Sequence, residues 1–228
     1  MNTAFRIRLL IGTLTMVVIT LASSPLQAQL LGQVSTARTL ERGANDVGGY
    51  LGLFEDYTTV FGQYRHGLSG NLDFGLQGGI VDPDARGADA GLIIGGDLKW
   101  MVMAAGADPL DMALAARASI YDVGNLSVFS VGGLVLISRD YRLSQGSYLS
   151  PYGGVNVRIE HSSFDSDGFG SGDSFAARIA QNGDDSDTEL DIGGVAGVKW
   201  EMSDLIDAIG ELVLDDNWGI VLGLNFKL

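Results

Sequence analysis

The last eleven residues of the chain, 218–228, alternate between two kinds of side chain. The apolar positions are Trp218, Ile220, Leu222, Leu224, Phe226 and Leu228. The positions between them are small or mostly polar: Gly219, Val221, Gly223, Asn225 and Lys227. Because successive side chains of a β-strand point to opposite faces, this period of two predicts a strand with one apolar wall and one small or polar wall.

The same alternation recurs from about residue 46 onwards, in short segments separated by turn residues. Helical periodicity is nearly absent, and the chain has 33 glycines but only 4 prolines. We therefore predict an all-β fold of about ten strands, with eight as the alternative. The strands are expected near 46–54, 57–66, 71–81, 92–102, 112–121, 125–137, 152–160, 190–201, 205–215 and 218–228. Segment 125–137 is apolar on both faces, so its inward face is not assigned.

Two environments would explain this alternation: lipid around a membrane barrel, or water around a soluble, lipocalin-like barrel with its aliphatic side chains inside. The polar face favours lipid, because it carries mostly glycine, asparagine, glutamine and a few charges of both signs. The outward aromatic side chains also favour lipid, because alternating strands would gather them at one interfacial rim. They are Tyr64, Phe74, Trp100, Trp200 and Phe226. An unpaired amide in hydrocarbon costs several kcal/mol, so the first strand should pair with the last.

The strand pattern over 46–228 and the ending Gly223-x-x-Phe226-x-Leu228 resemble the small bacterial outer-membrane β-barrels, the porin-like and OmpA/OmpW-like proteins. Leu228 stands where phenylalanine is usual in that class. The resemblance implies a closed, antiparallel, up-and-down transmembrane β-barrel, inserted by the outer-membrane assembly machinery. It also implies contact with outer-membrane lipids and lipopolysaccharide, with Gly223, Phe226 and Leu228 serving as the assembly signal.

The N-terminus predicts an exported protein. Arg6 and Arg8 precede a short apolar run, and a cleavage site follows after Ala28, so residues 1–28 are interpreted as a signal peptide. Cleavage would remove two positive charges and change the net charge from −14 to −16, which disfavours nucleic acid as a partner. The chain has no cysteine, so no disulfide supports the fold. Residues 29–45 lack the alternation and are interpreted as a periplasmic lead-in.

Charged residues on the predicted inner face are the main candidate site. They are Asp97, Lys99, Arg117, Arg158, Glu160, Lys199, Glu201 and Glu211. In a narrow lumen such groups need opposite charges as partners. They would either line a small hydrophilic pore or form a charge network that plugs and stiffens the barrel.

The stretch near 161–187 is predicted to be a long acidic extracellular loop. Asp165, Asp167 and Asp173 are spaced like carboxylates of a calcium loop, but a fifth-position ligand and a terminal glutamate are missing. A solvated acidic loop that binds divalent cations weakly is therefore the default interpretation. The loop also allows an alternative function, in which the protein is a surface-exposed binding module.

Catalysis is not predicted. The chain has two histidines: His66 lies at the base of a predicted strand, and His161 stands next to Ser162 and Ser163 at the start of the long loop. Adjacent side chains in an extended segment point to opposite faces, which does not suit a nucleophile and its base. We therefore expect a non-enzymatic outer-membrane protein without a cofactor, serving envelope structure or passage of small solutes. The further alternative is a soluble periplasmic ligand-binding barrel.

Deletion of the last three residues, Phe226, Lys227 and Leu228, should block membrane insertion because it removes the end of the closing strand. The measurement is heat-modifiable migration of the membrane-extracted protein in gel electrophoresis. Unchanged heat-modifiable folding in membranes would count against this assembly signal.

Overall fold

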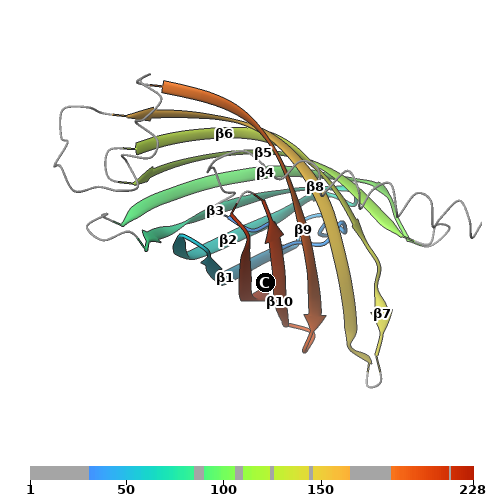
Figure 1. Ribbon diagram of the computed structural model, residues 1–228. Coiled ribbons are helices and arrows are strands. Elements are labelled where there is room, and N and C mark those ends of the chain that lie inside the picture. The colour runs from blue at the N-terminus through green and yellow to red at the C-terminus, as the bar shows by residue number, and fades with distance from the viewer. Residues whose placement is uncertain are drawn as a thin grey trace, which may run out of the picture.

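Figure 1 shows the chain as a computed structural model. The structure describes residues 31–84, 90–105, 110–123, 126–143, 146–164, 186–215 and 217–228. The predicted signal peptide and its cleavage site after Ala28 lie outside the described residues, as does most of the acidic loop. Within the described residues, no helix is long and apolar enough to span a membrane.

Ten long strands form a closed antiparallel barrel, and one further strand of two residues, β7, is added to it (Figure 1). The strands are β1 (Asn45–Phe54), β2 (Tyr57–Ser69), β3 (Leu72–Pro83), β4 (Gly91–Met103), β5 (Asp111–Val123), β6 (Leu126–Ser138), β7 (Tyr141–Arg142), β8 (Tyr148–Phe164), β9 (Ser186–Glu201), β10 (Ile206–Leu214) and β11 (Gly219–Lys227). The barrel closes because β1 pairs with β11 and β6 pairs with β8. The two-residue β7 pairs only with β8 and is an addition to the barrel wall. The predicted ten-strand up-and-down topology is confirmed.

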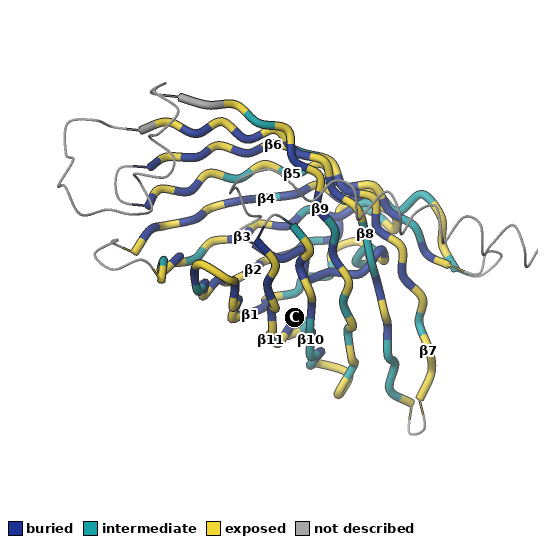
Figure 2. Tube along the Cα trace, viewed as in Figure 1, coloured by how far each residue is buried: buried dark blue, intermediate teal, exposed yellow. Residues whose placement is uncertain are grey.

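The aliphatic rows face outward, as predicted. Exposure alternates residue by residue along every long strand (Figure 2). The outward set includes Leu51, Val60, Leu76, Ile94, Leu114, Val157, Ile192 and Leu222, each at least 40% exposed. A soluble barrel would bury these rows, so that alternative is contradicted. A closed sheet with an apolar exterior satisfies its backbone internally and suits hydrocarbon, which makes this a transmembrane β-barrel.

The two ends of the barrel differ. We call the end where β1 begins and β11 ends the terminal rim, and the end where β8 ends and β9 begins the far rim. The five predicted interfacial aromatics all lie toward the terminal rim, where Tyr64 and Phe74 make an edge-on contact at 6.2 Å between ring centroids. These five agree with an interfacial girdle at the terminal rim, while the outward Phe129 and Trp218 lie toward the far rim.

The inward face of β6 follows from its neighbours. Pairing places Gly132 opposite Arg117 of β5 and opposite Arg158 of β8, and both arginines point inward. A Cβ on Gly132 would lie 2.6 Å from the carbonyl oxygen of Val157, so this glycine keeps the wall free between the two long side chains. Leu134 and Leu136 consequently face the lumen, a result that the two apolar faces of this strand did not reveal.

Large aromatic side chains inside the barrel lie over glycines of the adjacent strand. Tyr50 pairs with Gly223, Phe54 with Gly219, Phe61 with Gly79, and Tyr152 with Gly197. At Gly223, an added Cβ would stand 2.2 Å from the Tyr50 ring. At these four positions the missing side chain of the glycine leaves room for the aromatic ring in the narrow lumen.

The adjacent glycines of β3 test this arrangement. Gly79 faces inward, and its added Cβ would lie 2.3 Å from the carbonyl oxygen of Val60 and 2.5 Å from Cβ of Phe61. Gly78 faces outward, and its nearest neighbour would be at 3.8 Å. We expect Gly79→Ala to destabilise the barrel by about 1–3 kcal/mol through overpacking. Urea unfolding followed by tryptophan fluorescence measures this loss of stability. The matched control variant Gly78→Ala should keep the wild-type midpoint. Equal midpoints for the two variants would contradict the role of Gly79 in packing.

Candidate functional site

All eight charged residues of the predicted lumen network lie on the inward phase of their strands. Six of them are well inside the barrel, and Lys99, Glu160 and Glu211 are at most 2% exposed. Lys199 and Glu201 lie at the terminal rim, where their side chains are 21% and 28% exposed. The structure distributes these residues over separate clusters and joins them to carboxylates that were not among the predicted site residues.

One cluster lies toward the terminal rim. The guanidinium of Arg65 on β2 donates to Asp73 on β3 and, at 2.6 Å, to Asp97 on β4. The ammonium of Lys99 lies 3.5 Å from the other oxygen of Asp73. These four side chains are all at most 4% exposed, so each charge depends on the others for compensation.

A second cluster lies toward the far rim and centres on Arg158 of β8. Its guanidinium contacts Glu160 at 2.7 Å, Asp191 of β9 at 3.2 Å, and Asp215, which follows β10. The three carboxylates come from different parts of the chain and meet around one cation. The cluster therefore links the neighbouring strands β8 and β9 and the end of β10 on the lumen side of the wall.

A third cluster closes the terminal rim beside β11. Lys227 lies 3.1 Å from Asp207 and 3.3 Å from Glu201, and Lys199 lies 3.5 Å from Asp207. Asp207 is fully buried although both lysines are partly exposed. The closing strand is thus held to β9 and β10 by side chains as well as by its backbone pairing.

The lumen also contains a segment of the chain itself. Residues 31–40, here called the N-terminal segment, enter from the terminal rim, and residues 31–37 are buried within the barrel. We predicted a periplasmic lead-in for 29–45, and the described part of that stretch up to residue 40 lies against inward side chains instead. The difference arises because inward charges of the wall bind main-chain atoms, which sequence periodicity does not show.

Glu211 and Arg117 hold the inner end of the N-terminal segment. The Glu211 carboxylate accepts the amides of Gln33 and Val34 at 2.7 Å and 2.8 Å, and the hydroxyl of Tyr152 also donates to it at 2.7 Å. The guanidinium of Arg117 donates to the carbonyl of Gly32 at 2.9 Å. Both charges were predicted as lumen residues, and their partners include backbone groups.

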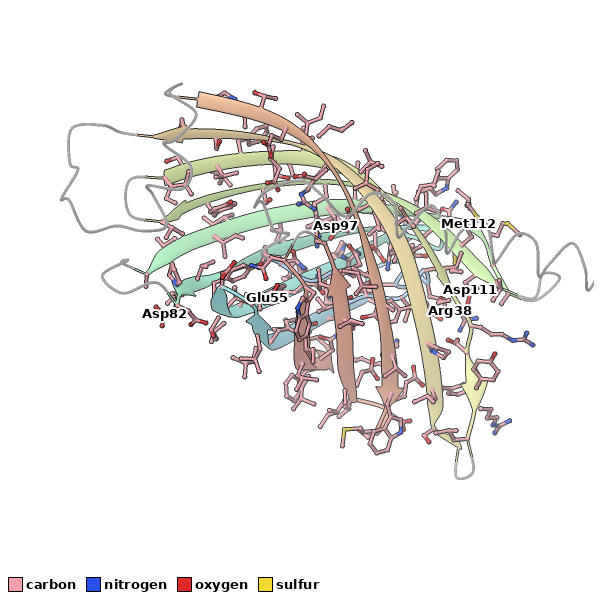
Figure 3. The ribbon with its side chains drawn as sticks, in the orientation of Figure 1. Arg38, Glu55, Asp82, Asp97, Asp111 and Met112 are labelled. Carbon is pink, nitrogen blue, oxygen red and sulfur yellow. The ribbon has the colours of Figure 1, made fainter. Side chains whose placement is uncertain are left out.

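Lys99 holds the outer half of the segment. Its ammonium donates to the carbonyls of Thr36 at 2.9 Å and Arg38 at 2.7 Å, and to the hydroxyl of Ser35 at 2.6 Å. At the rim, the Arg38 side chain contacts Asp111 at 3.3 Å and Asp140 at 2.6 Å. Figure 3 shows Arg38 and Asp111 together at one end of the barrel, with Asp97 farther inside.

A small cavity lies beside the inner end of the segment. A cavity of about 40 Å³ lies between Leu31 and the far-rim cluster. Its lining includes Gln77, Arg117, Tyr121, Arg158 and Glu160. A single buried water needs roughly 10–15 Å³, so this cavity has room for only a few water molecules.

The predicted assembly residues lie in the closing strand. Gly223 faces the Tyr50 ring, while Phe226 points outward and is 44% exposed. The amide of Leu228 donates to the carbonyl of Asn45 at 2.8 Å, at the start of β1. Their recognition by an assembly machinery stays a prediction.

The other candidates do not form a site in the described residues. His161 points outward and contacts Thr188 at 2.9 Å, while Ser162 is buried on the inner face, as predicted for sequence neighbours. No group of three metal-binding side chains occurs in the part of the chain that the structure describes. Asp165, Asp167 and Asp173 lie outside it, and with them the basis of the surface-binding alternative.

Sequence reasoning missed the partner carboxylates Asp191, Asp207 and Asp215, as well as the N-terminal segment. A usable signal existed for all three carboxylates, because each lies on the inward phase of a predicted strand. For the segment there was no comparable signal, although residues 31–37 contain no charged residue.

The fold and the filled lumen together define a small transmembrane β-barrel. No protein-family model and no curated protein matches the sequence. Among solved structures, the N-terminal β-barrel domain of Pseudomonas aeruginosa OprF is similar at 11% identity and a TM-score of 0.38, covering 83% of this chain and 100% of that one. The KdgM porin is similar at 6% identity and a TM-score of 0.39, covering 80% and 99%. Neisserial surface protein A is similar at 13% identity and a TM-score of 0.36, covering 81% and 95%.

The terminal-rim cluster predicts a strong dependence on Arg65. Arg65→Met should destabilise the barrel by about 3–5 kcal/mol, because it leaves Asp73 and Asp97 buried without their guanidinium. The urea midpoint of the refolded protein measures the loss. The control is Arg42→Met, which removes an exposed arginine of the same size at the terminal rim and should stay within about 0.5 kcal/mol of wild type. A wild-type midpoint for Arg65→Met would show that the cluster is not needed for stability.

Proposed function

We propose that this protein is a non-enzymatic integral outer-membrane β-barrel that serves envelope structure and keeps its own lumen closed. The observation that carries the proposal is the N-terminal segment inside the barrel. Its buried residues 31–37 occupy the lumen, where a conducting barrel would hold water. Among the two predicted roles of the lumen charges, this arrangement supports a plug over a passive pore.

The strength of the anchoring supports a closed resting state. Hydrogen bonds to charged groups contribute more than neutral ones, about 1.5–3 kcal/mol each. Glu211, Arg117 and Lys99 supply several such bonds to the segment, spaced along its length. A segment held at three heights does not leave by thermal fluctuation of one contact.

The outer membrane is the proposed location, with the terminal rim in the periplasm. The apolar exterior, the aromatic girdle at the terminal rim and the predicted signal peptide support it. The far rim would then face the exterior, where Glu55 and Asp82 lie (Figure 3). Outer-membrane lipids, lipopolysaccharide and the assembly machinery are the partners that this location implies, with divalent cations as further candidates at the acidic exterior.

Single-channel recording in planar bilayers tests closure. We expect the wild-type protein to give no stable conductance steps. A variant lacking residues 31–40 should give regular steps, because water would replace the segment along the inward charges. Heat-modifiable migration must first show that the variant folds. Stable steps from the wild type would refute the closed barrel, and they would favour the passive pore.

A further inference from the structure

The N-terminal segment lies in the lumen as a separate piece of chain outside the sheet. None of its described residues belongs to a strand or takes part in the pairing of the barrel wall. The ten wall strands pair fully among themselves and close without it. The barrel wall is therefore complete without the segment, and the segment is enclosed by it.

The side chains of the wall bind the N-terminal segment mainly through the main-chain atoms of the segment. Four amides of the segment donate to oxygens of wall side chains. Gln33 and Val34 donate to Glu211, Ala37 donates to Ser138, and Leu40 donates to Asp73. Four carbonyls accept from wall cations: those of Leu31 and Gly32 from Arg117, and those of Thr36 and Arg38 from Lys99. Backbone groups are common to all peptides, so recognition of this kind depends only weakly on side chains.

The side chain of Gln33 shows how little the wall uses side-chain chemistry there. It is 1% exposed, and neither its amide nitrogen nor its amide oxygen has a hydrogen-bond partner among the described residues. A buried amide without a partner costs free energy. A wall built to recognise this side chain would have provided a donor or an acceptor for it.

The Glu211 contact is shaped for a peptide backbone. The amides of Gln33 and Val34 converge on the two oxygens of one carboxylate. Val34 adopts a φ of 45°, a left-handed conformation that is unfavourable for a β-branched residue. Successive amides in such a turn form a concave nest for an anion, and Glu211 is the anion.

The wall groups are positioned by the barrel itself. The Tyr152 hydroxyl donates to Glu211, the Arg117 guanidinium also donates to the side chain of Gln77, and Lys99 lies beside Asp73. These groups come from β3, β4, β5, β8 and β10 and surround the lumen. The site is therefore present in the wall independently of the covalent link to the segment.

We propose that the lumen is a binding site for a polypeptide segment outside the barrel wall, that residues 31–40 are its resident ligand, and that the ligand need not be covalently attached. The proposal rests on the closure proposed above and adds the class of ligand. The accepted peptide turns at its fourth position, where Val34 has a φ of 45°, and it needs a small residue at its second position, because a Cβ on Gly32 would lie 2.6 Å from the Glu211 carboxylate. The site would take another chain of this kind in exchange for the resident one.

An exchange experiment on the full chain tests this. A protease recognition sequence is placed between Glu41 and Gly43, in the exposed connection at the terminal rim, and the refolded protein is cut there. A fluorescein-labelled synthetic peptide of the sequence Leu31–Leu40 is then added, and its anisotropy is followed in detergent micelles. We expect saturable binding that unlabelled peptide reverses, and no binding to the uncut protein, whose tethered segment occupies the site.

Matched variants separate main-chain recognition in the lumen from nonspecific adsorption of the peptide to the micelle. A Gln33→Leu peptide should bind about two- to tenfold more tightly, since it buries no unpaired amide. A Gly32→Val peptide should bind at least about tenfold more weakly because of the clash at Glu211. Glu211→Gln in the barrel should weaken the wild-type peptide by about tenfold or more, because the charged acceptor of two amides is lost.

The outcomes are distinct. Failure of the labelled peptide to bind the cut, folded barrel would overturn the proposal, and so would a Gln33→Leu peptide that binds more weakly than the Gly32→Val peptide. Peptide binding is measured by anisotropy and does not depend on conductance. If the cut barrel binds the peptide while the wild type conducts, the closed barrel is refuted and the peptide site is still supported. If the wild type gives no conductance steps and the cut barrel does not bind the peptide, the closed barrel is supported and the peptide site is refuted.

Discussion

The backbone pairing between β1 and β11 is the constraint on which the rest of this structure depends. An amide without a partner costs several kcal/mol in hydrocarbon, so a sheet with free edges is not stable there. The register from Asp46 opposite Lys227 to Phe54 opposite Gly219 removes both edges at once. Closure also has a consequence for side chains: every second one is directed into a lumen that lipid does not reach.

That lumen has to compensate whatever the inward positions carry. Arg65 and Arg158 each meet two or more carboxylates from neighbouring strands, and the aromatic rings lie over glycines. Glu211 and Lys99 have fewer side-chain partners and bind the backbone of the N-terminal segment. The N-terminal segment thus fills the lumen and also supplies backbone partners for Glu211 and Lys99, which explains why residues 31–37 are buried although they form no strand.

The candidate site was partly predictable. Inward phase alone identified Asp97, Lys99, Arg117 and the other charges, because a strand directs alternate residues to one side. The pairing between them was not predictable, since it depends on register and on long side chains reaching across strands: Arg158 on β8 meets Asp215, which follows β10. The segment was missed for a similar reason, because its partners are up to 178 residues away in the sequence.

By itself, the sequence determined the class of fold, the outward face of nearly every strand and the closure by its last residues. These follow from local periodicity and from the chemistry of the solvent, both of which are written in neighbouring residues. Only the tertiary structure decided which face of β6 is inward, which charges pair, and that residues 31–40 lie inside the barrel. Each of these depends on groups that barrel closure brings together from distant parts of the chain, and a local sequence pattern does not show which distant residues come into contact.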